Sequence, residues 1–184
     1  MKTNKQNQYP SELAALMSQA ANASRVHMQK DGFVAPLFIA QSADVRLLLP
    51  LDEYPAHQIP RAIQLWSVAN RATVGLHISE AWVATPTPEE RNDITFRPSL
   101  SAQRREVLLL NGEARGGVKK LQFLPILRNP NGTFMDFGPV ILMPPQLVSG
   151  FYSGMLPVST PTDAERLAAV KALSFLSESV TPTK

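Results

Sequence analysis

The sequence contains no cysteine, and this absence excludes several kinds of chemistry at once. Disulfide bonds, thiol nucleophiles and cysteine-ligated zinc sites all need that residue, and its absence is typical of a reducing compartment. No stretch has the apolar length of a signal peptide or of a membrane span. We therefore expect a soluble, cytoplasmic protein that makes no contact with a membrane.

Catalytic motifs and metal-ligand spacings are also missing. The chain has no G-x-S-x-G, no phosphate loop of the form G-x₄-G-K-[ST] and no G-x-G-x-x-G. His27, His57 and His77 show none of the short spacings that bind zinc. We interpret His77 as a half-buried residue at the rim of a sheet, pointing away from Glu80 three residues later on the same strand. These absences favour a noncatalytic protein without a cofactor or a metal.

Glycine is scarce beside proline, with 9 glycines against 16 prolines, and this ratio predicts many rigid bends. The hydrophobic content of 44% with 18% charged residues is ordinary for a globular protein and argues against disorder. A chain of this length suits one packed domain. We expect that domain to span residues 11–178, with flexible tails at 1–10 and 179–184.

Residues 74–143 follow the pattern of consecutive β-strands. Apolar runs rich in β-forming residues are separated by turn signals at Gly116-Gly117 and at residues 129–132. A further pair of strands is expected at 33–40 and 45–49, although Pro36 cannot donate to a ladder. This order predicts antiparallel strands that follow one another as a meander.

The hairpin around Gly116-Gly117 predicts a specific register. If these two glycines are the central residues of a two-residue turn, Leu109 opposes Leu124 and Glu113 opposes Lys120. Arg105 then opposes Arg128, a like-charge pair that predicts either a frayed end or a binding spot.

Three longer helices complete the expected fold. Ser11 is a cap for a helix to Lys30, Pro60 begins one that ends at Thr73, and Thr162-x-x-Glu165 is a capping box that begins the last helix. The apolar face expected for that last helix comprises Leu167, Val170, Leu173 and Leu176. We predict an α+β fold in which about three helices cover one face of an antiparallel meander sheet of about six strands, with a partly closed barrel as the alternative.

Basic residues are concentrated between residues 97 and 128. Two interpretations stay open: a nucleic-acid-binding surface, or positive charges that protect a sheet edge from pairing with another strand. Only Phe96 and Phe123 supply aromatic rings nearby. The candidate binding residues are Arg97, Arg104, Arg105, Arg115, Lys119, Lys120 and Arg128.

Residues 85–103 have three prolines, mixed charges and no sustained period, and we predict that they form a recognition loop. The leading hypothesis is a noncatalytic macromolecule-binding protein, an adaptor or inhibitor, that uses this loop and the charged hairpin. Its partner is another protein or a second copy of the chain, since apolar runs such as 108–110 need cover on both faces of the sheet.

Two hypotheses from other classes remain. One is a nucleic-acid binder that uses the basic hairpin. The other is a small metal-dependent hydrolase, in which sheet carboxylates converge beside Lys119 or Lys120. The carboxylates concerned are Glu80, Glu106, Glu113 and Asp136. No resemblance to a known family is specific enough to choose among these hypotheses.

Overall fold

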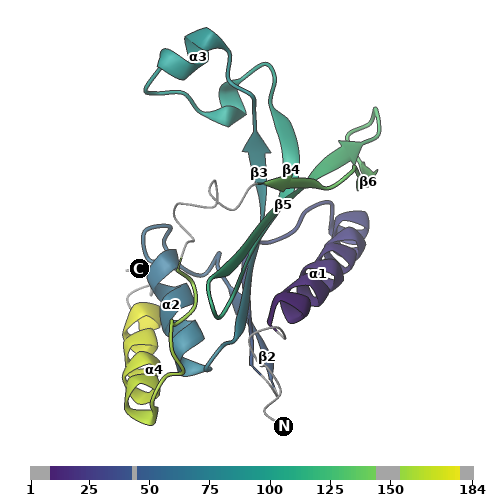
Figure 1. The fold of residues 1–184 in the computed structure, drawn as a ribbon. Coiled ribbons are helices and arrows are strands. Elements are labelled where there is room, and N and C mark those ends of the chain that lie inside the picture. The colour runs from purple at the N-terminus through teal and green to yellow at the C-terminus, as the bar shows by residue number, and fades with distance from the viewer. Residues whose placement is uncertain (1–8, 43–44, 144–153, 179–184) are drawn as a thin grey trace.

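The computed structural model describes residues 9–42, 45–143 and 154–178, so most of both predicted tails lies outside the described residues. An antiparallel sheet, curled into a half-barrel, forms the centre of a single α+β domain (Figure 1). In chain order the elements are α1 (Tyr9–Asp31), β1 (Leu37–Gln41), β2 (Arg46–Pro50), α2 (Ile59–Ala69), β3 (Val74–Val83), α3 (Pro88–Asn92), the 3₁₀ turn η2 (Pro98–Leu100), β4 (Arg105–Ala114), β5 (Val118–Arg128), β6 (Phe134–Phe137), β7 (Ile141–Met143) and α4 (Asp163–Glu178).

The strands lie in the order β2-β1-β3-β4-β5-β6, and every pair is antiparallel. The last strand, β7, also pairs with β5, beside residues 121–123, whereas β6 pairs with residues 126–128. The predicted α+β class and the meander from β3 to β6 are therefore confirmed, together with the curling of the sheet. In the described part of the chain, every helix is too short or too polar to cross a bilayer.

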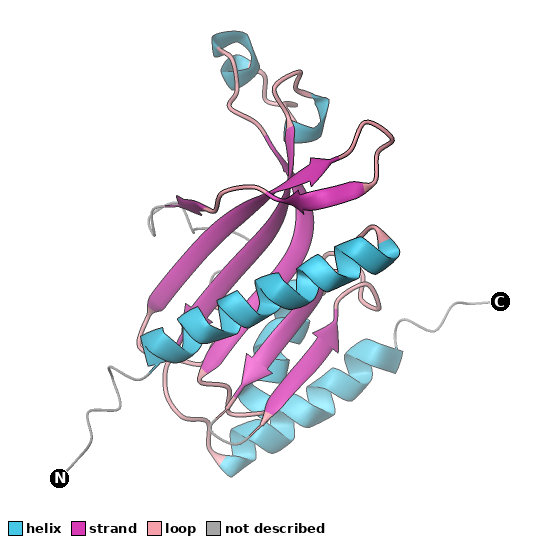
Figure 2. Cartoon of the chain, turned by 90° about the vertical axis from the view of Figure 1, so that its right-hand side faces the viewer, coloured by secondary structure: helices cyan, strands magenta, loops and turns pink. Residues whose placement is uncertain are grey.

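Helices cover both faces of the sheet, which corrects the prediction that they cover one face. Successive strand residues point to opposite faces, so Leu108 and Leu110 face α1 and pack with Leu13 in the larger of the clusters that form the core. On the opposite face Phe38 packs with Ile63 of α2 in a second cluster. Figure 2 shows α1 lying across one face, with α2 and α4 behind the other. This arrangement explains why β4 carries an uninterrupted apolar run.

A glycine in β4 lets α1 lie close to the sheet. A Cβ atom added at Gly112 would stand 2.6 Å from Leu13 Cδ1 and 3.3 Å from Met17 Sδ. Real Cβ atoms do not approach another heavy atom to 2.6 Å, so a larger residue here would displace the buried Leu13 side chain from its place against the sheet.

The predicted hairpin register is wrong by one residue. Ala114 pairs with Val118, so the turn contains Arg115 as well as the two glycines, both of which have positive φ angles. Leu109 consequently opposes Phe123. The predicted register would have turned Leu124 away from α1. Because the face of the sheet that packs against α1 is buried, the fold selects the observed register.

Two element boundaries also differ from expectation. Residues 33–36 precede β1 without joining the sheet, and the backbone N–H of Val34 donates instead to the Glu80 carboxylate at 2.6 Å. Helix α2 ends at Ala69, before the predicted Thr73, because Arg71 adopts a left-handed conformation with φ 49°. A helix cannot continue through a residue in that conformation.

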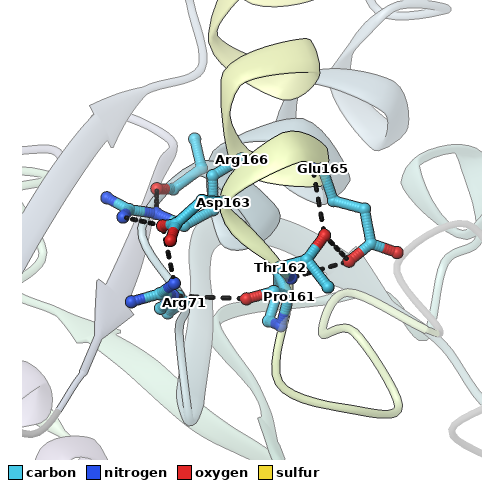
Figure 3. Close-up of polar contacts among 7 residues, drawn as sticks. Arg71, Pro161, Thr162, Asp163, Glu165 and Arg166 are labelled. Carbon is cyan, nitrogen blue, oxygen red and sulfur yellow. Dashed lines mark hydrogen bonds and ion pairs between the residues drawn. The ribbon is translucent and has the colours of Figure 1, made fainter.

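Helix α4 begins at the predicted capping box and is attached to the α2–β3 turn. The Thr162 hydroxyl accepts from the backbone N–H of Glu165 at 3.2 Å, and the Glu165 carboxylate accepts from the N–H of Thr162 at 2.7 Å. Arg71 donates to Asp163 at 2.8 Å, as Figure 3 shows. The expected apolar face is correct for Leu173 and Leu176, which pack beside α2, but Leu167 and Val170 are exposed.

Candidate functional site

One segment projects beyond the end of the sheet (Figure 1), and we call residues 84–104 the arm. Val83 pairs with Arg105, so the arm leaves β3 and returns to β4 at neighbouring strand ends. The predicted recognition loop, residues 85–103, therefore lies entirely within the arm. Its position leaves it free to contact another molecule.

The arm is locally ordered by a helix that the sequence analysis missed. The Thr87 hydroxyl accepts from the N–H of Glu90 at 3.2 Å, and the Glu90 carboxylate accepts from the N–H of Thr87 at 2.8 Å. Pro88 occupies the first turn of α3. Thr87-Pro88-x-Glu90 is a capping-box signal, so the sequence did contain the information needed to find this helix.

A polar turn after α3 holds an apolar side chain in solvent. The Asp93 carboxylate accepts from the backbone N–H of Thr95 at 2.8 Å and from its hydroxyl at 2.6 Å. These bonds lower the pKa of Asp93 below its ordinary value. Ile94, between the two residues, is fully exposed, and Leu100 of η2 is largely exposed. The arm thus presents two large apolar side chains to solvent on a short, capped scaffold.

A pocket of about 550 Å³ lies at the base of the arm. Arg104, at its edge, has its guanidinium carbon 5.4 Å from the centre of the Trp82 ring. None of the described residues that line the pocket is acidic. Its lining comprises Val83, Ala84, Thr85, Gln103, Arg104, Arg105, Phe123 and Ile141.

The structure separates the candidate basic residues into different places. Arg104 and Arg105 lie at the base of the arm, whereas Lys119 and Lys120 lie near the opposite end of the β4–β5 hairpin. Most of the length of β5 separates the two pairs, roughly 25 Å at the usual rise per strand residue. Arg97 lies in the arm itself. These residues therefore do not form one continuous positive surface.

Two of the candidate arginines have partners within the fold. Arg115 donates to the backbone carbonyls of Arg71 and Ala72 at 3.2 Å and 2.7 Å, which ties the hairpin tip to the turn after α2. Arg128 donates from two nitrogens to both carboxylate oxygens of Glu106, each at 2.7 Å. These bonds raise the pKa of Arg128 above its ordinary value. Both side chains are thus engaged in contacts that stabilise the sheet.

The four sheet carboxylates do not gather at one site, and only Glu80 and Glu106 among them act together, since both lie near Arg128 and raise its pKa. Glu80 accepts from Val34, Glu106 pairs with Arg128, and the buried Glu113 accepts from the N–H of Met155 at 2.8 Å. Asp136 pairs with Arg25 of α1 at 2.8 Å, a hydrogen bond that lowers the pKa of Asp136. Across the described ranges, no group of three or more His, Asp or Glu residues could hold a metal ion. The arrangement offers no geometric basis for the two-metal hydrolase.

His77 is buried in the core, which corrects its interpretation as a half-buried residue at a sheet rim. It is 1% exposed and lies opposite Asn111 in the β3–β4 ladder. Burial lowers its pKa from 6.5 to about 4, so the imidazole is neutral near pH 7. Glu80 lies on the other face of β3, as predicted, so the two residues do not act as an acid–base pair.

A second hollow, of about 310 Å³, lies between α2 and α4. Its walls are mainly apolar, with Leu65 and Val68 on one side and alanines of α4 on the other. Its charged residues, Arg61 and Glu165, have opposite signs, and Glu165 is bound within the capping box. This hollow therefore carries no net charge that would select a charged ligand.

Comparison with known proteins adds no family or relative to this description. No protein-family model, no curated protein and no solved structure matches the chain. The arm and the pocket at its base are therefore the features of this chain that indicate its function.

Proposed function

We propose that the protein is a noncatalytic macromolecule-binding protein, an adaptor or an inhibitor, and that the arm contacts a partner protein. The observation that carries this proposal is the exposure of Ile94 on the turn closed by Asp93 and Thr95. A large apolar side chain gains nothing from full exposure in the isolated chain. It gains free energy when it enters a pocket on a partner.

The magnitude of that gain supports a central role for the tip of the arm. Burying one isoleucine side chain contributes about 1.5–3 kcal/mol, which corresponds to roughly a tenfold to 150-fold change in affinity. The hydrogen bonds of α3 and of the Asp93 turn reduce the conformational entropy that the arm loses on binding. Leu100 and the polar residues of α3 would extend the contact around Ile94.

The other two hypotheses have less support. A nucleic-acid groove needs cations that follow a phosphate backbone, but the basic residues lie at opposite ends of the hairpin, and Arg115 and Arg128 are already bound within the fold. The hydrolase needs convergent carboxylates, and those of the sheet have separate partners. A second copy of the chain remains a candidate partner.

The experiment is an affinity purification from the source cells with three versions of the chain. These are the wild type, Ile94→Asp, and the matched control Val158→Asp, which places the same charge at a position 97% exposed just before α4. A partner found with the wild type is then purified, and its affinity for each version is measured.

We expect Ile94→Asp to weaken the partner's affinity at least tenfold, or about 1.4 kcal/mol, and the control to leave it unchanged. Circular dichroism and thermal unfolding check that both variants fold. Equal affinities for Ile94→Asp and the wild type would show that the arm is not the contact surface.

A further inference from the structure

The pocket at the base of the arm has a chemical character of its own. We propose that it binds a small organic anion, a carboxylate attached to an apolar body. The proposal is independent of the proposed function, because Ile94 lies in the arm and does not line the pocket.

The first reason is positive charge without an acidic neighbour. Arg104 and Arg105 both line the pocket, and neither guanidinium has an ion pair or a hydrogen bond with another described residue. The adjacent acid in the sequence, Glu106, points to the opposite face of β4 from Arg105 and is held by Arg128 through two bonds. An anion entering the pocket would therefore compensate the charge of Arg105, whose side chain emerges on the face of the sheet that lines the pocket.

The second reason is the side chain that Arg105 brings to this face of the sheet. Trp82 opposes Glu106 in the ladder, so the Arg104 guanidinium that lies over the Trp82 ring is on the other face, and Arg105 supplies the contact to the anion. A planar guanidinium matches the geometry of a carboxylate with two parallel hydrogen bonds, and charge-assisted bonds of this kind are roughly twice as strong as neutral ones.

The third reason is the apolar wall beside these cations. Val83 and Arg105 oppose each other in the ladder, so their side chains emerge on the same face of the sheet. Phe123 shares that face through its pairing with Leu109. Ala84 and Ile141 complete an apolar lining that a bare inorganic anion would leave unfilled.

The size of the pocket fits a small molecule. Its volume of about 550 Å³ falls within the range of pockets that bind drug-sized ligands. Apolar surface with a few polar groups that fix orientation is the usual composition of such pockets. The charge, the apolar lining and the volume together point to an amphipathic acid such as a medium-chain fatty acid or an aryl carboxylate.

The test measures binding of three probes to the purified chain by isotope-edited NMR. Octanoate carries both the charge and the apolar body, octanamide lacks the charge, and acetate lacks the body. We expect saturable octanoate binding with a Kd below about 1 mM, shifts at Val83, Arg105 and Ile141, and at least tenfold weaker binding of the other two probes.

Variants locate the anion contact. Arg105→Gln should lower the affinity for octanoate to that for octanamide, whereas Arg97→Gln, which removes an arginine of the arm outside the pocket, should leave it unchanged. Equal binding of octanoate and octanamide, an unaffected Arg105→Gln variant, or an octanoate Kd weaker than about 1 mM would overturn the proposal. Ile94→Asp should retain octanoate binding, which separates this result from the test of the arm.

Discussion

Arg71 adopts a backbone conformation that usually selects glycine, with φ 49°. Its side chain donates to the carbonyl of Pro161 at 3.2 Å and to Asp163 at 2.8 Å, so the turn after α2 holds the segment that leads into α4 (Figure 3). These contacts offset the strain of the left-handed backbone, and they explain why arginine rather than glycine stands here.

Two substitutions separate strain from contacts at this position. Arg71→Ala loses the hydrogen bonds and keeps the strained backbone, whereas Arg71→Gly loses the same bonds and relieves the strain. We expect the alanine variant to have a free energy of unfolding lower than that of the glycine variant by about 1 kcal/mol. Urea unfolding measures the difference, and equal stabilities would show that the left-handed conformation costs nothing here.

His77 makes stability depend on pH. Its pKa is lowered to about 4 in the fold, against 6.5 for an ordinary histidine, so the unfolded chain binds more protons between those values. The free energy of unfolding is unaffected by His77 above about pH 6.5, and it falls as the pH drops toward 4. On acidification from about pH 7.5 to pH 5, we expect this residue to lower the free energy of unfolding by about 2 kcal/mol.

The control for His77 is His77→Asn, which keeps a polar side chain without a titrating group. Carboxylates such as Asp136, whose pKa is also lowered, contribute equally in both proteins. The loss of stability on acidification should therefore be smaller in the variant by about 2 kcal/mol. Equal losses in urea titrations at the two pH values would contradict a buried neutral imidazole.

Sequence patterns predict residues whose partners are close in the chain. The capping box at Thr162 and Glu165 was found because its spacing is local, and the one at Thr87 and Glu90 carries the same signal. The role of Arg115 was not predictable, since the carbonyls it binds belong to residues far away in sequence. A cluster of arginines does not reveal in advance which of them the fold will use.

The β4–β5 hairpin shows what limits prediction for an element. Two glycines at a turn indicated where the chain reverses, but they did not show whether Arg115 belongs to the turn. The choice depends on burial, because the observed register places Leu108, Leu110 and Leu124 against α1. That helix is remote in sequence, so a local pattern could not supply the register.

The absence of cysteine allows a direct test of this register. Leu109 faces Phe123 across the ladder, and directly opposed residues lie about 4.5–5.5 Å apart, within the range that a disulfide bridges. We expect Leu109→Cys with Phe123→Cys to form a disulfide on mild oxidation. Leu109→Cys with Leu124→Cys should retain free thiols, because those side chains point to opposite faces, and thiol titration distinguishes the outcomes.

At the scale of the whole molecule, the α+β class and the meander from β3 to β6 were predictable because they depend on the succession of apolar runs and turns. The curling of the sheet was predicted only as the alternative, and the projection of the arm depends on contacts between distant segments that no local pattern contains. The core is also divided into clusters on the two faces of the sheet, with α1 on one face and α2 and α4 on the other (Figure 2). The sequence did not show this division.

The expected homodimer remains a prediction at this scale. The sheet faces already have helical cover, but α4 exposes Leu167, Val170 and Phe175. Apolar side chains of this size gain free energy if a second copy covers them. We expect light scattering to show a dimer that Val170→Asp converts to a monomer. A wild-type monomer over a wide concentration range would exclude self-association.

The arm also affects the order in which the strands assemble. β4 and β5 meet through a three-residue turn, whereas β3 cannot pair with β4 until the whole arm has closed as a loop. Closing the 21 residues 84–104 costs about 1.7 kcal/mol more chain entropy than closing the three-residue turn. The β4–β5 hairpin should therefore lie in the folding nucleus and β3 should join later, so kinetic φ-values should be high at Leu108 and Leu124 and lower at Leu76.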